Sequence, residues 1–244
     1  MLIRFIVSNF LSFKEETEFN MLTGNYKIHK GHVYRKNGID LVKAAAIYGA
    51  NGAGKSNLVQ AIATLQNFIA EGEIDFWKDE KFRLDKSFMD KPVSMQIEFA
   101  IEKNILLYTL IFDEDKVYME NLYKTNYEKE EMIFERKTLK TGKTALKLHS
   151  KYSKTQKDKI MRELYEEELL TGKKLFIHFA QRKYTEIGLA FKWLTGSLII
   201  IYPDSSYNTL TFHYDKIQAF RQFLNLLIPM LDTGIKSIEM EMAP

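Results

Sequence analysis

The chain has 244 residues, of which 45% are hydrophobic, and a formal net charge of +3. This length allows one large domain or two small ones, and the apolar content is ample for a buried core. The absence of cysteine excludes disulfides, thiolate zinc sites and cysteine nucleophiles. The first residues lack a signal-peptide pattern and no apolar run is long enough to span a membrane, so we expect a cytoplasmic protein without membrane contact. The net charge is too small to argue for nucleic-acid binding by itself.

The N-terminal residues predict two strands joined by a turn. Residues 2–7 alternate in polarity, which is typical of a strand with one buried face. Residues 9–13 form a polar and aromatic turn, and a second strand is expected around residues 17–22. Residues 23–40 are polar and contain glycines, and they predict a surface loop.

Residues 49–56 read Gly-Ala-Asn-Gly-Ala-Gly-Lys-Ser, a complete GxxxxGK[ST] phosphate-binding loop. The apolar residues 44–48 precede it as an expected strand, and apolar residues at helical spacing from Leu58 to Ile69 predict a helix behind it. Glycines let the backbone N–H groups approach a triphosphate closely, and the helix N-terminus adds its positive dipole end. The sequence therefore predicts binding of a nucleoside triphosphate. A glycine-rich turn that matches by chance is the alternative, and the full-length pattern with both flanks disfavours it.

The loop predicts a role for each of its residues. Lys55 is expected to reach the β- and γ-phosphates as a point charge, and the Ser56 hydroxyl to ligate the magnesium that bridges them. The expected cofactors are ATP and Mg²⁺, and Lys55 is also a candidate catalytic residue. The predicted nucleotide-binding residues are Asn51, Gly52, Ala53, Gly54, Lys55, Ser56 and Asn57.

Two groups of residues carry a resemblance to a known family. They are Asn9, Phe10, Ser12 and Phe13, and the run from Tyr48 to Ala61. Together they resemble the ABC-type ATPases of the SMC, RecF and OLD group, and look closest to the free-standing ATPases of bacterial anti-phage defence systems. The resemblance implies an α/β lobe with an antiparallel sheet beside the nucleotide-binding sheet. It also implies ATP hydrolysis between two subunits of a dimer, and an effector such as a nuclease or a toxin.

The middle of the chain predicts an antiparallel meander beside the nucleotide-binding sheet. Residues 93–101 alternate between apolar and polar, residues 105–112 and 117–123 continue the pattern after polar turns, and residues 132–136 are a further candidate strand.

Two stretches imitate a Walker B motif, in which apolar residues precede an acid that holds magnesium. In Leu110–Glu114 the pair Asp113 and Glu114 follows three apolar residues. The alternative is a charged turn between antiparallel strands, which the flanking alternation favours because a Walker B strand is buried and parallel. The second stretch, residues 199–204, contains a proline and is disfavoured as well.

The segment from Arg136 to Lys159 contains nine lysines and arginines and one acid, Asp158. It is either a basic segment that faces nucleic acid or a solvated hairpin or linker, and we favour the second because few of its side chains offer a stacking surface. A helix is expected over residues 157–170, with Ile160, Leu164 and Leu169 on its inner side. A later helix is expected over residues 214–231.

An apolar run at residues 173–181 predicts a strand that ends at Gln181. The resemblance implies that Gln181 is the glutamine of a Q-loop, which reaches the magnesium and the attacking water. Gln181 is therefore a candidate catalytic and metal-site residue, with a plain surface glutamine as the alternative. Beyond it the sequence contains no Ser-Gly-Gly signature, no Asp-Glu pair after a buried run and no switch histidine in place.

We expect three parts: an N-terminal ATPase lobe over residues 1–135, a basic segment with a helix and a strand over residues 136–180, and the start of a helical lobe over residues 181–244. The chain thus resembles the first half of such an ATPase. It is either a fragment of a longer chain, which its abrupt ending favours, or a departure that cannot hydrolyse ATP alone.

The resulting prediction is an ATP-hydrolysing protein that acts as a homodimer or higher oligomer and switches a nuclease or toxin effector in anti-phage defence. Two alternatives remain. One is a DNA-repair or DNA-binding ATPase of the RecF or SMC sort, in contact with nucleic acid. The other is a non-catalytic scaffold that uses bound nucleotide to hold a toxin or nuclease inactive.

Overall fold

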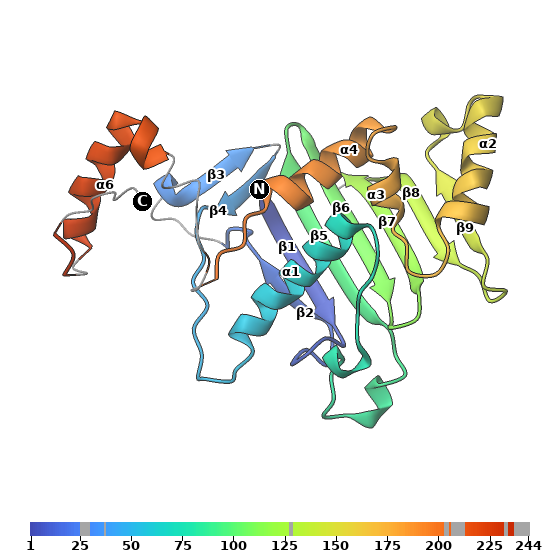
Figure 1. Ribbon diagram of the computed structural model, residues 1–244, viewed down its shortest axis with the longest axis horizontal. Helices are drawn as coiled ribbons and strands as arrows, with labels where there is room; N and C mark the ends of the chain where they lie inside the picture. The colour runs from blue at the N-terminus through green and yellow to red at the C-terminus, as the bar shows by residue number, and fades with distance from the viewer. Residues whose placement is uncertain are drawn as a thin grey trace, which may run out of the picture. The chain divides into compact units, whose positions relative to one another are not determined.

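The computed structural model describes residues 1–24, 30–36, 38–126, 129–202, 205, 213–231 and 234–236 (Figure 1). The chain forms two compact units, Met1–Ile200 and Ile201–Pro244. The expected boundary between residues 135 and 136 falls inside strand β8 (Glu130–Thr138), which pairs with a strand on each side. The hydrogen bonds of the sheet therefore continue across that expected boundary. The second expected boundary, between residues 180 and 181, also lies within the first unit.

The first unit is built on a seven-stranded sheet with the strand order β2-β1-β5-β6-β7-β8-β9. Its neighbouring strands are all antiparallel. The other six strands are β1 (Leu2–Ser8), β2 (Thr17–Asn20), β5 (Val93–Ile101), β6 (Asn104–Phe112), β7 (Val117–Thr125) and β9 (Thr144–Leu148). The predicted α/β class with an antiparallel meander is confirmed. Strand β9 was not predicted, because its five residues lie within the lysine-rich segment.

A two-stranded hairpin, β3 (Val33–Lys36) with β4 (Ile39–Val42), lies in the stretch predicted to be a loop. Ile39 and Leu41 are buried in a small cluster with Ile3, and the alternation in β4 sends both side chains to the same face. The hairpin was not predicted because its short alternation of apolar and polar residues lies in a mostly polar stretch.

The helices and helical turns fall between and after the strands. They are η1 (Lys30–His32), α1 (Lys55–Glu71), η2 (Lys78–Glu80), η3 (Lys86–Phe88), η4 (Ser150–Tyr152), α2 (Gln156–Leu164), η5 (Tyr165–Leu169), α3 (Phe176–Ala180), α4 (Thr185–Lys192), η6 (Trp193–Ser197) and α6 (Gln218–Met230). Helices α1, α3 and α4 lie on one face of the sheet (Figure 1). Leu65 and Ile69 of the predicted apolar stripe are buried there, and Leu58 and Ile62 pack at its margin.

The segment that begins with helix α2 differs from the prediction at Ile160, whereas Leu169 packs against the core as predicted. Ile160, expected on the inner side, is 56% exposed, whereas burial begins further along the chain at Tyr165 and Leu170. The reason is that this segment packs against the sheet through η5, where the Glu166 carboxylate accepts a hydrogen bond from the Leu146 N–H at 2.6 Å. Helix α2 itself remains at the surface.

A fully buried polar cluster joins the sheet to α3. The Tyr108 hydroxyl donates to the Glu120 carboxylate at 3.1 Å, and the N–H groups of Phe176 and Ile177 donate to it at 2.6 and 2.9 Å. The Arg136 guanidinium donates to three main-chain carbonyl oxygens at 3.2 to 3.4 Å. Burial raises the pKa of Glu120, and the nearby Arg136 opposes that rise. This carboxylate therefore fixes where α3 begins on the sheet.

Within the second unit, α6 confirms the predicted helix over residues 214–231, with its regular part at Gln218–Met230. Its sequence separates apolar from polar faces, and none of its side chains is fully buried. Residues 232–233, directly after this helix, and residues 237–244 lie outside the described residues.

Candidate functional site

The phosphate-binding loop leads directly into α1, which begins at Lys55. Gly52 and Gly54 have φ angles of +81° and +88°, in the left-handed region that favours glycine. A Cβ atom at Gly54 would lie 2.6 Å from the Ser12 Oγ. Both the backbone conformation and the close approach of Ser12 therefore require glycine at residue 54.

The residues at the start of α1 favour the binding of an anion. The Lys55 Nζ donates to the carbonyl oxygens of Gly49 and Ala50 at 2.7 and 2.8 Å, which holds the ammonium group over the loop. The first turn of α1 contains no acidic residue, so the helix itself brings no carboxylate to the positive end of its dipole. Such a terminus with free N–H groups and a lysine suits a phosphate group.

The structure brings together the seven predicted nucleotide-binding residues in this loop and in the first turn of α1. They are exposed or half-buried, so their N–H groups and side chains are accessible to a ligand. These residues are Asn51, Gly52, Ala53, Gly54, Lys55, Ser56 and Asn57.

The strand expected before the loop is not formed. Residues 44–48 have no regular secondary structure, and Ile47 and Tyr48 are 46% and 90% exposed. The sheet described here consists of antiparallel strands and ends at β2, so no described strand pairs with this apolar run. The local sequence predicts an extended segment, but a strand also needs a partner.

The turn at residues 9–13 holds Ser12 against the phosphate-binding loop. Asn9 is buried with a φ of +55°, and its Nδ2 donates to two main-chain carbonyls of the segment 88–91 at 2.8 Å each. The Leu11 N–H donates to the Glu80 carbonyl at 2.7 Å. The connection between α1 and β5 is thereby fixed beside the loop.

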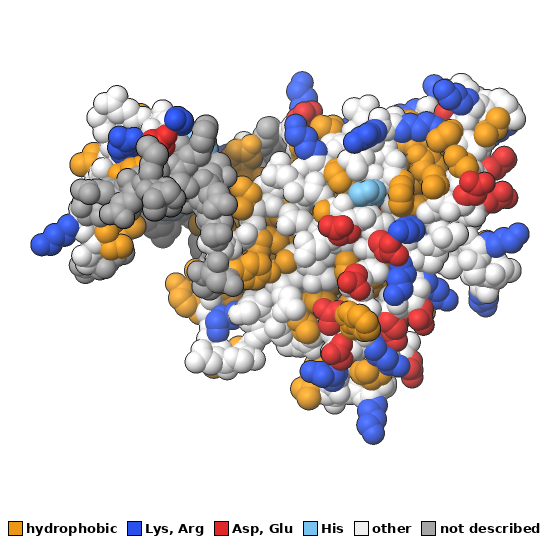
Figure 2. All heavy atoms as spheres, viewed as in Figure 1, with side chains coloured by type: hydrophobic (Ala, Val, Ile, Leu, Met, Phe, Trp, Pro, Cys, Tyr) orange, Lys and Arg blue, Asp and Glu red, His pale blue; other side chains and the backbone are white. Residues whose placement is uncertain are grey.

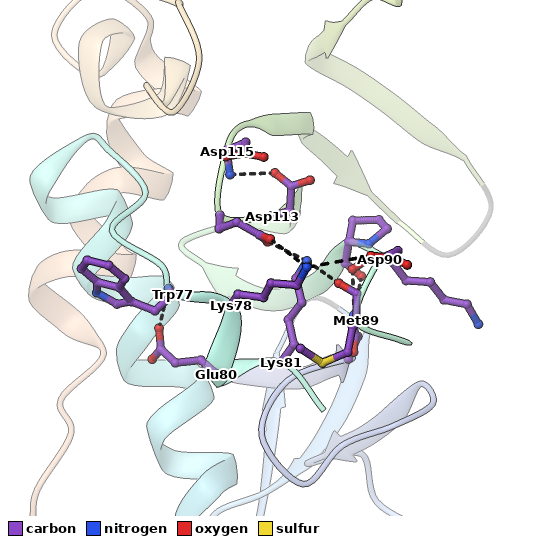
Figure 3. Close-up of polar contacts among 12 residues, drawn as sticks. Trp77, Lys78, Glu80, Lys81, Met89, Asp90, Asp113 and Asp115 are labelled. Atoms are coloured by element: carbon purple, nitrogen blue, oxygen red, sulfur yellow. Dashed lines mark hydrogen bonds and ion pairs between the residues drawn. The ribbon is translucent and has the colours of Figure 1, made fainter. Parts of the chain in front are cut away.

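The structure confirms that Asp113 and Glu114 form a hairpin turn. The Asp113 carboxylate accepts hydrogen bonds from the N–H groups of Asp115 and Lys116 at 2.9 Å, between the antiparallel strands β6 and β7. The Glu114 carboxylate lies 2.6 Å from the Nζ of Lys81. Figure 3 shows Asp113 and Asp115 above the two lysines of the α1–β5 connection. These carboxylates stabilise the fold and are not assembled around the phosphate-binding loop.

The structure does not bring Gln181 to the phosphate-binding loop. The predicted strand is instead the short helix α3, and the Gln181 Nε2 donates to the carbonyl of His178 at 2.9 Å. The His178 Nδ1 lies 3.2 Å from the carbonyl of Ile69, at the C-terminal end of α1. Lys55 is fourteen residues earlier (69 minus 55), which corresponds to about 21 Å along a helix. The side chains buried in α3 are at residues 176, 177 and 180, a helical rather than an alternating spacing.

Two cavities flank the phosphate-binding loop. The larger has a volume of about 320 Å³ and is lined by Leu11, Ser12, Asn57, Asp79, Lys81, Phe82, Arg83 and Leu84. The smaller has a volume of about 240 Å³ and is lined by Phe13, Thr17, Glu18, Phe19, Ile47, Tyr48, Ala53, Gly54, Lys55 and Leu58. Residues 79–84 were not predicted to belong to a site, because they lie in a charged, irregular stretch without a motif.

The lysine-rich segment forms the β8–β9 hairpin and the start of α2. Acidic side chains lie close to some of its lysines. The Lys147 Nζ lies 3.9 Å from the Glu135 carboxylate, and Lys151 forms an ion pair with Glu186. Red and blue side chains lie close together around α2 and β9 (Figure 2). The structure confirms a hairpin in this segment.

Two further findings concern metals and membranes. In the described part of the chain, no three histidine, cysteine or acidic residues gather in a way that could hold a metal ion. The predicted metal-site residues Ser56 and Gln181 lie at opposite ends of α1. Among the helices described, none is both long and apolar enough to cross a membrane.

Comparison with known proteins places this loop in a family. No curated protein matches the chain. Residues 44–242, which include the phosphate-binding loop and both flanking cavities in part, match the family described as "AAA domain, putative AbiEii toxin, Type IV TA system". Since this match covers more than half of the sequence, the chain belongs to that family of AAA-type P-loop ATPase domains.

Proposed function

We propose that this chain binds ATP with Mg²⁺ through residues 51–57 and is the nucleotide-binding part of an ATPase. The observation that carries the proposal is the complete phosphate-binding loop at the positive end of α1. Gly52 and Gly54 have φ angles in the left-handed region, and the Lys55 ammonium group lies over the loop. Membership of the AAA-domain family supports the same activity.

Each loop residue has a chemical task in this proposal. The main-chain N–H groups donate to phosphate oxygens, Lys55 neutralises the β- and γ-phosphates, and Ser56 ligates the magnesium. Bound magnesium supplies further positive charge to the triphosphate. Gln181 has no task in this proposal, since it lies at the other end of α1.

We further propose that hydrolysis takes place in a homodimer or higher oligomer. Among the described residues, the Asp-Glu pair at 113 and 114 belongs to a turn, so the acid that prepares the water comes from elsewhere. ATP that bridges two subunits favours the closed state by its higher affinity for that state. Turnover that rises more steeply than linearly with protein concentration would support this assembly.

The family description supports a role in defence. It names an AbiEii toxin and a type IV toxin–antitoxin system. We therefore propose that the nucleotide state switches a toxin or nuclease effector in anti-phage defence. A scaffold that binds ATP, keeps a partner inactive and shows negligible turnover is the non-catalytic form of the same proposal, and a turnover assay on the purified complex separates the two.

The decisive experiment compares Lys55→Ala with a matched lysine variant by calorimetry with ATP and magnesium. Lys55→Ala removes the charge over the loop and is expected to weaken ATP binding at least roughly ten-fold, which corresponds to about 1.4 kcal/mol. Lys103→Ala changes an exposed lysine in the β5–β6 turn and should leave ATP affinity unchanged. Wild-type affinity in Lys55→Ala, with an unchanged unfolding temperature, would refute the assignment.

Nucleic-acid binding is a second candidate function, favoured by the exposed lysines of the β8–β9 hairpin. Lys137, Lys140 and Lys143 lie at its tip and are exposed. Acidic partners near other lysines of the segment reduce the local positive potential, which makes this the weaker candidate. DNA affinity that falls with salt and with neutralisation of these three lysines would support it.

A further inference from the structure

The larger cavity beside the phosphate-binding loop has the size and composition of a ligand site. Its volume of about 320 Å³ lies at the lower end of the range for small-molecule sites. Ser12 and Asn57 belong to its wall, and Asn57 directly follows the loop residues in the first turn of α1. A phosphate chain held by the loop therefore has this cavity at its side.

The polar side chains around this cavity have unused hydrogen-bonding capacity. In the part of the chain that the structure describes, the side chains of Asn57, Asp79 and Arg83 have neither a hydrogen bond nor an ion pair. Other charged side chains nearby are paired, as in the contact between Lys81 and Glu114. A carboxylate and a guanidinium left free around one cavity can serve a ligand that offers both donors and acceptors.

The wall of the cavity is held in place by contacts with its surroundings. Lys81 is only 3% exposed, and its Nζ lies 2.6 Å from the Glu114 carboxylate and donates to the Met89 carbonyl at 3.1 Å (Figure 3). The Phe82 ring packs edge-on against Phe88, with centroids 6.3 Å apart. Phe82 is therefore a braced aromatic ring at the cavity wall, available for stacking.

The smaller cavity on the other side of the loop has a different composition. Phe13, Phe19, Ile47 and Tyr48 line it, and of its described lining residues only Glu18 is acidic. Among the described residues that line it there is no arginine and no asparagine. A nucleobase needs a flat stacking partner together with groups that read its polar edge, and the larger cavity offers both.

We propose that the larger cavity receives the nucleoside end of the bound triphosphate, with the base against Phe82 and its exocyclic amino group donating to Asp79. The ligand class is thus a nucleoside triphosphate whose base has an amino group, such as ATP. This inference rests on the proposed function, because it requires the phosphates in the loop at residues 49–56. Arg83, on the same wall, offsets the negative charge that Asp79 brings near the phosphates.

The test uses three ligands with magnesium in calorimetry: ATP, purine riboside triphosphate, which lacks the amino group, and inorganic tripolyphosphate, which lacks the nucleoside. Phe82→Ala is expected to weaken ATP binding roughly ten-fold, in line with the loss of one stacked base, and to leave tripolyphosphate binding unchanged. Asp79→Ala is expected to reduce the preference for ATP over purine riboside triphosphate by about five-fold, the value of one hydrogen bond. Phe19→Ala, in the smaller cavity, is the matched control and should change neither affinity.

Each outcome decides one proposal. If neither ATP nor tripolyphosphate binds to the wild-type chain, the proposed function fails. Suppose that both ligands bind, that Phe82→Ala leaves the ratio of ATP to tripolyphosphate affinity unchanged, and that Asp79→Ala leaves the preference for ATP over purine riboside triphosphate unchanged. Then only the proposed nucleoside site is wrong. Loss of ATP affinity in Phe19→Ala alone would place the nucleoside in the smaller cavity. Thermal unfolding of each variant separates these results from a failure to fold.

Discussion

The two ends of α1 show opposite uses of polar groups. Near its C-terminal end, the cluster of Glu120, Arg136 and Tyr108 is fully buried, and all its described hydrogen bonds are made within the fold, although the Arg136 Nε has no partner there. Near its N-terminal end, the phosphate-binding loop, Asp79 and Arg83 are exposed or half-buried, and the Asp79 and Arg83 side chains lack partners in the described structure. Buried polar groups with internal partners stabilise and position a fold, whereas accessible groups with unused capacity are available to a ligand. Substitutions at the two ends should therefore separate stability from binding.

The largest loss of stability is expected for Arg136→Met. This change leaves the Glu120 carboxylate buried without its nearby cation and removes the donor to three main-chain carbonyls. Breaking such a buried charge arrangement costs about 3–5 kcal/mol in the free energy of unfolding. Urea denaturation measures it, with Lys137→Met at the adjacent exposed residue as the control.

A double variant tests the reason for this loss. Arg136→Met with Glu120→Leu removes both buried charges and should recover part of the stability. If Arg136→Met unfolds at the wild-type urea concentration, the cluster does not hold α3 on the sheet in the way inferred.

At the other end of α1, Gly54→Ala should affect binding more than stability. The new Cβ would lie 2.6 Å from the Ser12 Oγ, and the φ of +88° is unfavourable for alanine. We expect ATP affinity to fall more than roughly ten-fold, while the free energy of unfolding falls by only about 1–2 kcal/mol. Gly142→Ala, with a φ of +82° and no atom within 4 Å of the new Cβ, is the matched control for backbone strain.

The contribution of the clash itself can be isolated. Ser12→Ala combined with Gly54→Ala removes the Oγ and leaves the Ser12 Cβ at an ordinary 3.5 Å. Part of the ATP affinity should return. The loss of stability that comes from placing alanine at a left-handed φ, which Gly142→Ala also shows, should persist. Equal ATP affinity in Gly54→Ala and the wild type would mean that the loop binds nothing in this conformation.

Local patterns were enough to predict the elements that depend on local interactions. The phosphate-binding loop is a contiguous motif, and the helix behind it has apolar residues at the spacing of its buried face, such as Leu65 and Ile69. The meander from β5 to β8 was predictable because each strand alternates in polarity and ends at a polar turn. These signals lie within a few residues of the structure that they specify.

The failures have a common physical cause, which is an interaction between residues distant in the sequence. Helix α3 replaces a predicted strand because its first N–H groups donate to Glu120, 56 residues earlier in the chain. Residues 44–48 have strand-forming side chains but no described partner strand. The cavity at residues 79–84 depends on the Asn9 side chain, whose acceptors lie about 80 residues further along the sequence. No local pattern contains this information.

The smallest effect is expected for Asp85→Asn, at the contact that ties the turn at residues 9–14 to the α1–β5 connection. The Asp85 carboxylate lies 3.0 Å from the Lys14 Nζ and accepts hydrogen bonds from the N–H and hydroxyl of Ser87 at 2.9 and 2.8 Å. The hydrogen bond from Lys14, followed by those from Ser87, lowers the pKa of Asp85 from 3.8 to about 2. Because the folded-state pKa is below the unfolded-state value, the stabilisation is present above pH 3.8 and is lost as the pH falls through about 2.

Asp85→Asn should lower the melting temperature slightly at pH 7, and the difference from the wild type should vanish between about pH 4 and pH 2. Asp90→Asn, at an exposed carboxylate of the same segment, is the control. A difference that persists at pH 2 would show that the shape of the Asp85 side chain matters rather than its charge, and that this contact resembles the buried end of α1 more than the exposed end.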